Sequence, residues 1–268
     1  MANWFATQPD QVLAGQTAVV MGGGSGIGKA TAQSLIAAGA NVMICGVPEQ
    51  LCLDTAKELA ADAKEGQKVL GMLCDGTNQE NIDAMLKKTV DECGEINIVV
   101  STAGIALPRM NVLDVTPEQY DKIFNVNVKA NWFLATSAGK IMKEQGKGGK
   151  IVIISSGRGT RPMENIAPYS TTKSAVMGMV RAMAVDLAKY DIRVNGIAPG
   201  YVFTPMVKKV FEEQPQQEAY VKSRTPLRDY TYMGSLDEMA SAIMFFLNPI
   251  NEYTTGQTIV LDGGWSLQ

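Results

Sequence analysis

The sequence predicts an α/β domain with a doubly wound, mainly parallel sheet, and three observations support this. Short apolar runs alternate with helical patterns along nearly the whole chain. Several of these runs are apolar throughout, as expected of strands buried on both faces. The length of 268 residues suits one large α/β domain better than two. We therefore expect a single domain, residues 1–268, with a seven-stranded sheet and helices on both faces.

Individual elements follow from the same patterns in chain order. The expected strands are residues 17–21, 41–45, 68–73, 96–101, 150–155, 192–197 and 257–261. The expected helices are residues 26–38, 49–64, 79–93, 117–145, 168–189 and 236–247. Residues 1–12 precede the alternation as an N-terminal extension. Residues 200–235 contain no strand pattern, and an insertion of this kind in an α/β fold commonly covers the ligand, so we expect it to cover the substrate.

Composition excludes several classes of function. With 46% hydrophobic and 19% charged residues and a net charge of −3, the chain has no basic field for nucleic acid or an anionic membrane. It contains no histidine, which excludes Ser-His-Asp and Cys-His nucleophiles and histidine-bearing metal sites, and no metal is expected. The four cysteines form no CxxC pair and are interpreted as buried thiols in a reducing compartment. Neither a signal peptide nor an apolar run of about 18 residues is present, so a cytoplasmic location is expected.

A glycine-rich turn, GGGSGIG, follows the first expected strand and opens the first expected helix. Glycines at this place let backbone N–H groups and the helix N-terminus approach a pyrophosphate. No Gly-Lys-Ser/Thr follows, so the turn is not a phosphate loop of the Walker type. The turn therefore predicts a dinucleotide site formed by Gly22, Ser25, Gly26, Ile27 and Gly28.

A candidate proton-transfer site lies further along the chain. Tyr169 and Lys173 are four residues apart in a helical pattern and share one face of that helix. A tyrosine with a pKa near 10 is a poor acid or base at neutral pH, and a neighbouring ammonium lowers that pKa. Ser156 ends the fifth expected strand, at the sheet edge where ligands bind in such folds. The three side chains therefore predict acid-base chemistry beside the nucleotide.

These motifs, in this order, resemble the short-chain dehydrogenase/reductase family, a family with a Rossmann-type fold, from about residue 13 to residue 264. The resemblance implies that the catalytic residues are Asn127, Ser156, Tyr169 and Lys173. It also implies a cofactor site that extends the glycine turn, formed by Asp75, Gly76, Ala103, Gly104, Tyr169, Lys173, Pro199, Gly200, Val202 and Thr204. Asp75 matches the aspartate that bonds the adenine, and residues 199–206 resemble the segment that holds the nicotinamide amide.

The resemblance implies the reaction as well. Tyr169 exchanges a proton with the oxygen of a secondary alcohol or ketone while hydride moves between the nicotinamide and the carbon. Ser156 stabilises the charge on that oxygen, and Lys173 lowers the pKa of Tyr169 and holds the nicotinamide ribose. Asn127 is expected to hold a water that links Lys173 to solvent. Members of the family are commonly homotetramers, and here helices 117–145 and 168–189 would form the interface.

Three positions depart from the family pattern. Met21 replaces the threonine that opens the glycine motif, and Ser101 and Thr102 stand where the family has two asparagines. Gly46 and Val47 close the second strand, where the family places an acid for NAD or a base for NADP. Residues 41–56 contain no lysine or arginine that could pair with the 2′-phosphate of NADP. We therefore predict that NAD(H) is preferred over NADP(H).

The substrate-covering insertion carries many aromatic residues, namely Tyr201, Phe203, Phe211, Tyr220, Tyr230 and Tyr232, together with Met206 and Met233. These side chains either pack the insertion onto the rest of the protein or onto a neighbouring subunit, or form a wide apolar pocket. The second interpretation predicts a bulky apolar substrate such as a hydroxysteroid or bile acid, with Arg158 or Arg161 meeting a distal carboxylate.

Two other functions remain open. The first is reduction of 3-oxoacyl thioesters on an acyl carrier protein, for which Arg158, Arg161, Lys208 and Lys209 would form a basic rim, although Glu164, Glu212 and Glu213 interleave. The second is a non-catalytic nucleotide-sensing protein with the same fold. Sensors of this kind typically lose the tyrosine or the lysine, and this chain retains both.

Overall fold

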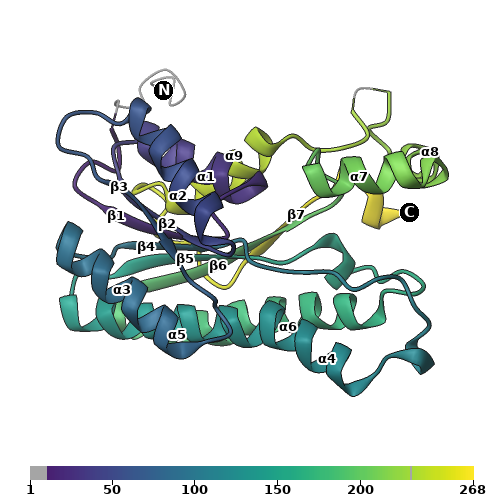
Figure 1. Cartoon of the computed structure of the whole chain (residues 1–268), viewed down its shortest axis with the longest axis horizontal. Coiled ribbons are helices and arrows are strands. Elements are labelled where there is room, and N and C mark those ends of the chain that lie inside the picture. The colour runs from purple at the N-terminus through teal and green to yellow at the C-terminus, as the bar shows by residue number, and fades with distance from the viewer. Residues whose placement is uncertain (1–10, 230) are drawn as a thin grey trace.

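Seven strands form one sheet in the computed structural model, which describes residues 11–229 and 231–268 (Figure 1). The strand order is β3-β2-β1-β4-β5-β6-β7, and every neighbouring pair is parallel. The strands are β1 Thr17–Met21, β2 Asn41–Gly46, β3 Val69–Leu73, β4 Ile98–Ser101, β5 Gly149–Ile154, β6 Ile192–Pro199 and β7 Thr258–Leu261. The predicted doubly wound parallel sheet is confirmed. Of the expected N-terminal extension, residues 1–10 lie outside the described part of the chain.

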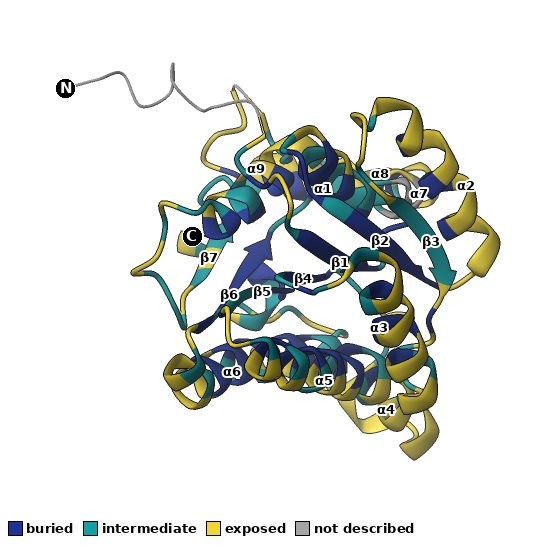
Figure 2. Cartoon of the chain, turned by 90° about the vertical axis from the view of Figure 1, so that its left-hand side faces the viewer, coloured by how far each residue is buried: buried dark blue, intermediate teal, exposed yellow. Residues whose placement is uncertain are grey.

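Helices cover both faces of the sheet (Figures 1 and 2). One layer holds α1 Gly26–Ala37, α2 Glu49–Leu59 and α9 Leu236–Leu247, and the other holds α3 Gln79–Cys93, α5 Ala130–Gln145 and α6 Ala167–Leu187. Alternate residues of β1 enter the two cores: Val19 and Met21 pack with the α3–α5–α6 layer, and Ala18 and Val20 pack with the α1–α2–α9 layer. This double burial explains why the strands are apolar at successive positions. Within the described residues, no helix is long and apolar enough to cross a membrane.

The helical pattern predicted over residues 117–145 is helical throughout, but it contains a π turn that the pattern did not indicate. A capping box formed by Thr116 and Gln119 starts α4, Pro117–Phe124. Residues Asn125–Lys129 then adopt a π-helical turn before α5 begins. Hydrophobic periodicity reports which face of a helix is buried, and a single wider turn leaves that face unchanged. A π turn of this kind is frequent at functional sites, and this one carries Asn127.

Two short helices occupy the insertion between β6 and β7, which we call the α7–α8 segment (residues 200–235). They are α7 Pro205–Glu213 and α8 Pro215–Arg224. The segment leaves and rejoins the domain at one place, because Val202 bridges to Gly234, Phe203 N–H donates to the Gly234 carbonyl at 2.9 Å and Gly234 N–H donates to the Tyr201 carbonyl at 2.9 Å. Phe211, Val221 and Met233 form a small core of its own. The segment therefore stands out from the sheet edge as a separate cover (Figure 1).

The strand order reverses between β1 and β4, since the chain runs outward from β1 in one direction to β3 and in the other to β7. In open α/β sheets, ligands bind in the crevice outside the carboxyl ends of the strands at such a switch point. Met21 ends β1 and Ser101 ends β4, so the loops that follow these two residues form the floor of the expected site.

Candidate active site

A cleft of about 540 Å³ opens at the carboxyl ends of the strands. All of the residues predicted to bind a cofactor line it: Gly22, Ser25, Gly26, Ile27, Gly28, Asp75, Gly76, Ala103, Gly104, Tyr169, Lys173, Pro199, Gly200, Val202 and Thr204. Ser156 lines the same cleft, and Asn127 lies behind its wall, fully buried. The structure thus brings the nucleotide motif and the Ser, Tyr and Lys side chains to one place.

The glycine turn packs too closely for side chains at three of its positions, Gly22, Gly23 and Gly28. A Cβ at Gly28 would lie 2.2 Å from the Gly22 carbonyl oxygen. Gly22 itself has a φ of +80°, and a Cβ there would lie 2.5 Å from Thr102 Oγ1. In contrast, a Cβ at Gly26 would meet nothing within 4 Å, so the space before the N-terminus of α1 is open. Unpaired N–H groups and the positive end of the helix dipole at this N-terminus suit a pyrophosphate.

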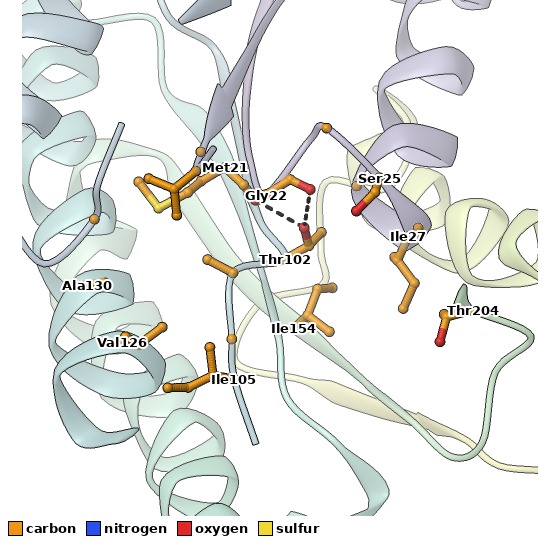
Figure 3. A pocket seen from close by; sticks show the side chains of 18 of the residues that line it. Met21, Gly22, Ser25, Ile27, Thr102, Ile105, Val126, Ala130, Ile154 and Thr204 are labelled. Atoms are coloured by element: carbon orange, nitrogen blue, oxygen red, sulfur yellow. Dashed lines mark hydrogen bonds between the residues drawn. The ribbon is translucent and has the colours of Figure 1, made fainter. Parts of the chain in front are cut away.

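Thr102 joins the ends of β1 and β4. Its Oγ1 donates toward the Met21 carbonyl at 3.0 Å and the Gly22 carbonyl at 3.2 Å (Figure 3). It therefore ties the sheet to the glycine turn from a position where the family has an asparagine. Ser101 does not take such a role, because its Oγ is buried without a hydrogen-bond partner in the described structure. Met21 is buried in the core and packs beside Gly76, where a Cβ would lie 2.9 Å from the Met21 sulfur.

Close packing holds α6 against the end of β5. A Cβ at Gly159 would lie 2.8 Å from the Lys173 carbonyl carbon, and the Ser155 hydroxyl donates to the Lys173 carbonyl oxygen at 2.7 Å. Only a residue without a side chain allows the loop after β5 to approach the helix backbone this closely. As a result, Ser156 from the loop and Tyr169 from the helix reach the same cleft.

Lys173 is buried, with 4% of its surface exposed. Its Nζ donates to the Ile154 carbonyl at 3.0 Å and lies 5.7 Å from the centre of the Tyr169 ring. Burial lowers the pKa of Lys173 to about 8. An ammonium carries three donors, and the bond to Ile154 uses one of them, so the others are available to a ligand in the cleft.

The pKa of Tyr169 differs from the expectation. Burial raises the pKa of Tyr169 above its usual value, and hydrogen bonding with Ser156 and the positive charge of Arg158 partly oppose this rise. The positive charge that opposes this rise is that of Arg158. The Lys173 ammonium lies 5.7 Å from the centre of the same ring, and the expectation that it lowers the pKa of Tyr169 stays a prediction.

The Asn127 side chain connects two elements behind the cleft. Its Oδ1 accepts a hydrogen bond from Ile105 N–H at 2.8 Å, and its Nδ2 donates to the Ile105 carbonyl at 2.9 Å and to Thr172 Oγ1 at 3.0 Å. The side-chain amide thus makes three hydrogen bonds within the protein, and the expected role of Asn127 in holding a water stays a prediction. Asn127 thereby fixes the loop after β4 against α6 next to Lys173.

A second cavity of about 370 Å³ adjoins the cleft and shares Ser156 and Tyr169 with it. Much of its wall is apolar: Leu107, Pro108, Met163, Ile166, Val207 and Trp265. Arg109, Arg158, Tyr201, Gln214 and Asp262 add polar groups. The sequence analysis singled out Arg158 and Tyr201 among these residues. Most of the others come from loops and from the C-terminal segment, where hydrophobic periodicity carries no signal, and were not predicted.

The aromatic residues of the α7–α8 segment mainly pack on one another. Of the six that were expected near the ligand, Tyr201 lines the second cavity. Phe203 packs edge-on against Tyr232 with ring centres 6.0 Å apart, and Phe211 packs against Tyr201 at 6.1 Å. Tyr230 lies outside the described residues, as does the Met206 side chain. Tyr220 packs against Trp265, outside the segment, with ring centres 6.5 Å apart. Most of the described rings therefore contact one another within the segment, and one packs the segment onto the rest of the protein.

Two of the cations expected at the rim lie over the same aromatic ring. The guanidinium carbons of Arg158 and Arg161 are 3.9 and 5.7 Å from the centre of the Trp265 ring, and Arg161 also donates to the Ser266 carbonyl at 3.3 Å. Lys208 lies 3.9 Å from Glu212 in an exposed ion pair, which contributes little to stability. The Lys209 side chain is outside the described part. Among the described cations, the two arginines are therefore together, whereas Lys208 is paired with a carboxylate.

The cysteines are free thiols in the structure. Cys45, Cys52 and Cys74 are buried and Cys93 is half-buried. Hydrogen bonding with Cys74 and burial raise the pKa of Cys45, and burial raises the pKa of Cys52, so both thiols stay protonated at neutral pH. In the described part of the chain, no group of three or more His, Cys, Asp or Glu side chains is arranged to hold a metal ion.

Substituting Lys173 should reveal the energetic cost of burying it. A pKa lowered from 10.5 to about 8 corresponds to about 3 kcal/mol of destabilisation by the charged form. The destabilisation is fully present below about pH 8, where Lys173 is charged in both the folded and the unfolded chain. Between about pH 8 and 10.5 only the unfolded chain keeps the proton, so the destabilisation decreases as the pH rises. Lys173→Met should therefore raise the free energy of unfolding of the cofactor-free protein by about 1–3 kcal/mol near neutral pH, and by less near pH 9.5.

Urea unfolding at both pH values measures this difference, with the exposed Lys189→Met as the control. Unchanged or lower stability of Lys173→Met at neutral pH would contradict the expectation. The same variant should lose activity, because the ammonium is the donor that faces the cleft.

The parallel sheet, the close-packed glycine turn and the cleft at the switch point define a Rossmann-type α/β fold. The family model described as "Enoyl-(Acyl carrier protein) reductase" matches residues 22–266. The chain is 32% identical over 253 residues to 2-dehydro-3-deoxy-D-gluconate 5-dehydrogenase of Escherichia coli, covering 94% of this chain and 96% of that protein. It is 30% identical over 255 residues to 3beta-hydroxysteroid dehydrogenase 2 of Eggerthella lenta, covering 95% and 96%.

Solved structures agree with these relatives. The crystal structure of a short-chain type dehydrogenase/reductase from Mycobacterium marinum superposes with a TM-score of 0.87 at 32% identity, covering 96% of this chain and 97% of that one. The chain belongs to the short-chain dehydrogenase/reductase family. It is accordingly an oxidoreductase that acts on alcohols or ketones, in a family that uses nicotinamide cofactors.

Proposed function

We propose that this enzyme transfers hydride between NAD(H) and a bulky, largely apolar secondary alcohol or ketone. The observation that carries the proposal is the junction of the two cavities. Ser156 and Tyr169 line both the cleft with the glycine turn and the adjoining apolar cavity, so a substrate oxygen at this junction would meet both hydroxyls. The Ser, Tyr and Lys side chains give the reaction its acid-base group and its oxyanion stabiliser.

The cleft fits a dinucleotide. The open space before α1 and the glycines around it suit the pyrophosphate, and Asp75 is fixed at the adenine end because its Oδ1 accepts from Thr77 N–H and Thr77 Oγ1 at 2.9 and 2.8 Å. Lys173 would hold the nicotinamide ribose with the donors that Ile154 leaves free. When bound, the nicotinamide supplies or accepts the hydride.

The side chains at the junction would transfer a proton to or from the substrate oxygen. Because burial raises its pKa, Tyr169 is protonated in the ligand-free chain at neutral pH and its Oη can donate to a carbonyl oxygen. The Ser156 hydroxyl would donate to the same oxygen and stabilise the charge that develops on it. In the reverse direction, the phenolate accepts the proton of the alcohol, and the positive charges of Arg158 and Lys173 favour that phenolate.

Preference for NAD(H) rests on the charges around the cleft. Of the described residues that line it, Lys173 is the only basic one. Val47 and Leu51, both apolar, lie where the second strand ends and α2 begins. Lys29, the nearest cation after the glycine turn, is held 2.7 Å from Glu58 in an ion pair. No described side chain in this wall therefore offers a cation to a 2′-phosphate, which NADP requires.

The substrate class follows from the second cavity. Its apolar wall suits a fused-ring or long aliphatic body, and the relative from Eggerthella lenta is named a hydroxysteroid dehydrogenase. The relative from Escherichia coli is named for a sugar-acid derivative, so relatives of equal similarity differ in substrate. We propose that the substrates of this enzyme are of the hydroxysteroid kind, bile acids included, because the wall of the second cavity carries several apolar side chains.

A substrate panel tests the proposal. Hydroxysteroids, acetoacetyl thioesters and polyols are compared by kcat/KM with both nicotinamide cofactors, and the Kd of NADH is compared with that of NADPH. We expect the hydroxysteroids to be preferred and NADH to bind more tightly. A tenfold or greater preference for a polyol contradicts the apolar pocket, a preference for the thioester supports the alternative reductase, and tighter binding of NADPH contradicts the cofactor assignment. Nucleotide binding without any turnover would support the sensor.

Assembly into a homotetramer in the cytoplasm completes the proposal. Trp132 and Phe133 on α5 are 44% and 38% exposed, and Val185 on α6 is 78% exposed. Large apolar side chains that are exposed on adjacent helices favour contact with another subunit. These two helices are the ones that the family resemblance implies for the interface.

A further inference from the structure

Arg158 lies in the wall of the second cavity as a cation without a carboxylate partner. Its guanidinium stacks on Trp265, and its Nη2 donates to the Tyr201 hydroxyl at 2.9 Å. Its Nη1 is buried and has no hydrogen-bond partner. None of the ion pairs among the described residues involves Arg158.

The protein interior does not account for this arrangement. Buried charged groups are normally paired, and a buried donor that lacks an acceptor destabilises the fold. Stacking on Trp265 stabilises the cation but offers Nη1 no acceptor. An acceptor supplied by a ligand would satisfy it.

The other charged groups in the cavity wall increase its preference for an anion. Asp262 is the one carboxylate among the described lining residues, and both of its oxygens are occupied: Oδ1 accepts from Gly264 N–H and Oδ2 from Ser266 N–H, each at 2.9 Å. Arg109 adds a second cation at the exposed side of the cavity, where it donates to Gln217 at 3.1 Å. The cavity wall thus contains two guanidinium groups and one carboxylate, and that carboxylate is hydrogen-bonded to the backbone of the C-terminal turn.

We propose that Arg158 binds a carboxylate of the substrate, so that the enzyme acts on an apolar hydroxy or oxo acid whose reacting oxygen lies at Ser156 and Tyr169. The proposal rests on the proposed function, because it places the substrate in the second cavity. A guanidinium pairs with a carboxylate through two parallel hydrogen bonds. The carboxylate reaches the guanidinium at Nη2, where it joins or displaces the Tyr201 hydroxyl. Nη1 is closed off from solvent, so the second hydrogen bond requires the atoms that cover Nη1 to move aside.

The structure also distinguishes Arg158 from Arg161, which the sequence pattern left equivalent. Arg161 lies 5.7 Å from the centre of the same Trp265 ring. It donates to the Ser266 carbonyl and is not among the residues that line the cavity. Arg161→Gln is therefore a matched control: it removes a guanidinium from the same tryptophan without removing one from the cavity wall.

The experiment compares acids with their methyl esters. Pairs built on a steroid, a fused-ring aromatic and a long aliphatic body are measured with the wild type, Arg158→Gln and Arg161→Gln. The Kd is measured by calorimetry with NAD⁺ present, and kcat/KM is measured by the appearance of NADH. For at least one pair, the wild type should bind the acid more tightly than the ester. Arg158→Gln should raise the Kd of the acid by about 10- to 100-fold and that of the ester by less than about twofold. Because the charge of Arg158 also acts on Tyr169, kcat/KM should fall for both compounds, and the acid-to-ester ratio of kcat/KM is the quantity compared. Arg161→Gln should leave the preference unchanged.

Two results would overturn the proposal. The first is a panel in which no acid binds more tightly than its ester. The second is an equal loss of affinity for the acid and for its ester in Arg158→Gln. That result would mean that Arg158 only supports Trp265. If the Gln variant does not fold, Arg158→Lys replaces it, and it should retain part of the preference for the acid. An acid that binds through Arg158 but is never oxidised or reduced contradicts the proposed function and still supports this inference.

Discussion

Tyr169→Phe should lower kcat by at least about 100-fold while the Kd of NADH stays within about twofold of the wild type. The substitution removes the hydroxyl that we propose exchanges a proton with the substrate oxygen, and it leaves the ring in place. The ring packs below the Lys173 ammonium, so the nicotinamide end of the cleft should keep its shape. Steady-state assays and a fluorescence titration of NADH measure the two quantities.

Tyr190→Phe is the matched control, because it removes a hydroxyl from a tyrosine that packs with Lys143 and Lys189 and does not line either cavity. It should retain wild-type activity. If Tyr169→Phe keeps more than a few per cent of wild-type kcat, another group carries the proton and the acid-base assignment is wrong.

Gly28→Ala should damage both stability and cofactor binding. The added methyl group would lie 2.2 Å from the Gly22 carbonyl oxygen, which belongs to the backbone and cannot rotate away as a side chain would. Overpacking of this kind costs about 1–3 kcal/mol of unfolding free energy. The glycine turn would shift to relieve the clash, and a shift of the phosphate-binding backbone should raise the Kd of NADH by about tenfold or more.

Gly178→Ala tests whether the effect is specific to the turn. Gly178 lies within α6, and a Cβ there would meet nothing within 4 Å. Alanine favours the helix, so this control should gain about 0.5–1 kcal/mol of stability and bind NADH normally. Urea unfolding and NADH titration of both variants give the comparison. Wild-type affinity for NADH in Gly28→Ala would mean that the turn does not hold the pyrophosphate.

The strands of the sheet were predictable because each is defined by a local pattern. β1 is apolar at successive positions since Val19 and Val20 enter opposite cores, and the predicted range, residues 17–21, coincides with the observed strand. The glycine turn was predictable for a similar reason, because a positive φ and close backbone contact leave glycine as the residue that fits.

The π turn at residues Asn125–Lys129 shows the limit of such patterns. It carries Asn127, whose side chain bonds Ile105 and Thr172, which are 22 and 45 residues away in sequence. No local periodicity contains these contacts. The same holds for Thr102, whose hydroxyl replaces a longer amide by reaching carbonyls 81 and 80 residues away.

Residue types and their spacing were sufficient to predict the α/β class, the nucleotide cleft and the Ser156, Tyr169 and Lys173 group, because each depends on short-range geometry: strand burial, a tight turn, or one helical face. The second cavity depended on the folded chain. Its wall combines loops after β4 and β5, the start of the α7–α8 segment and Trp265 near the C-terminus, segments that meet only when the sheet is complete. For the same reason, the pairing of Arg158 with Trp265 and the different surroundings of Arg161 follow from long-range packing, which no sequence pattern reports.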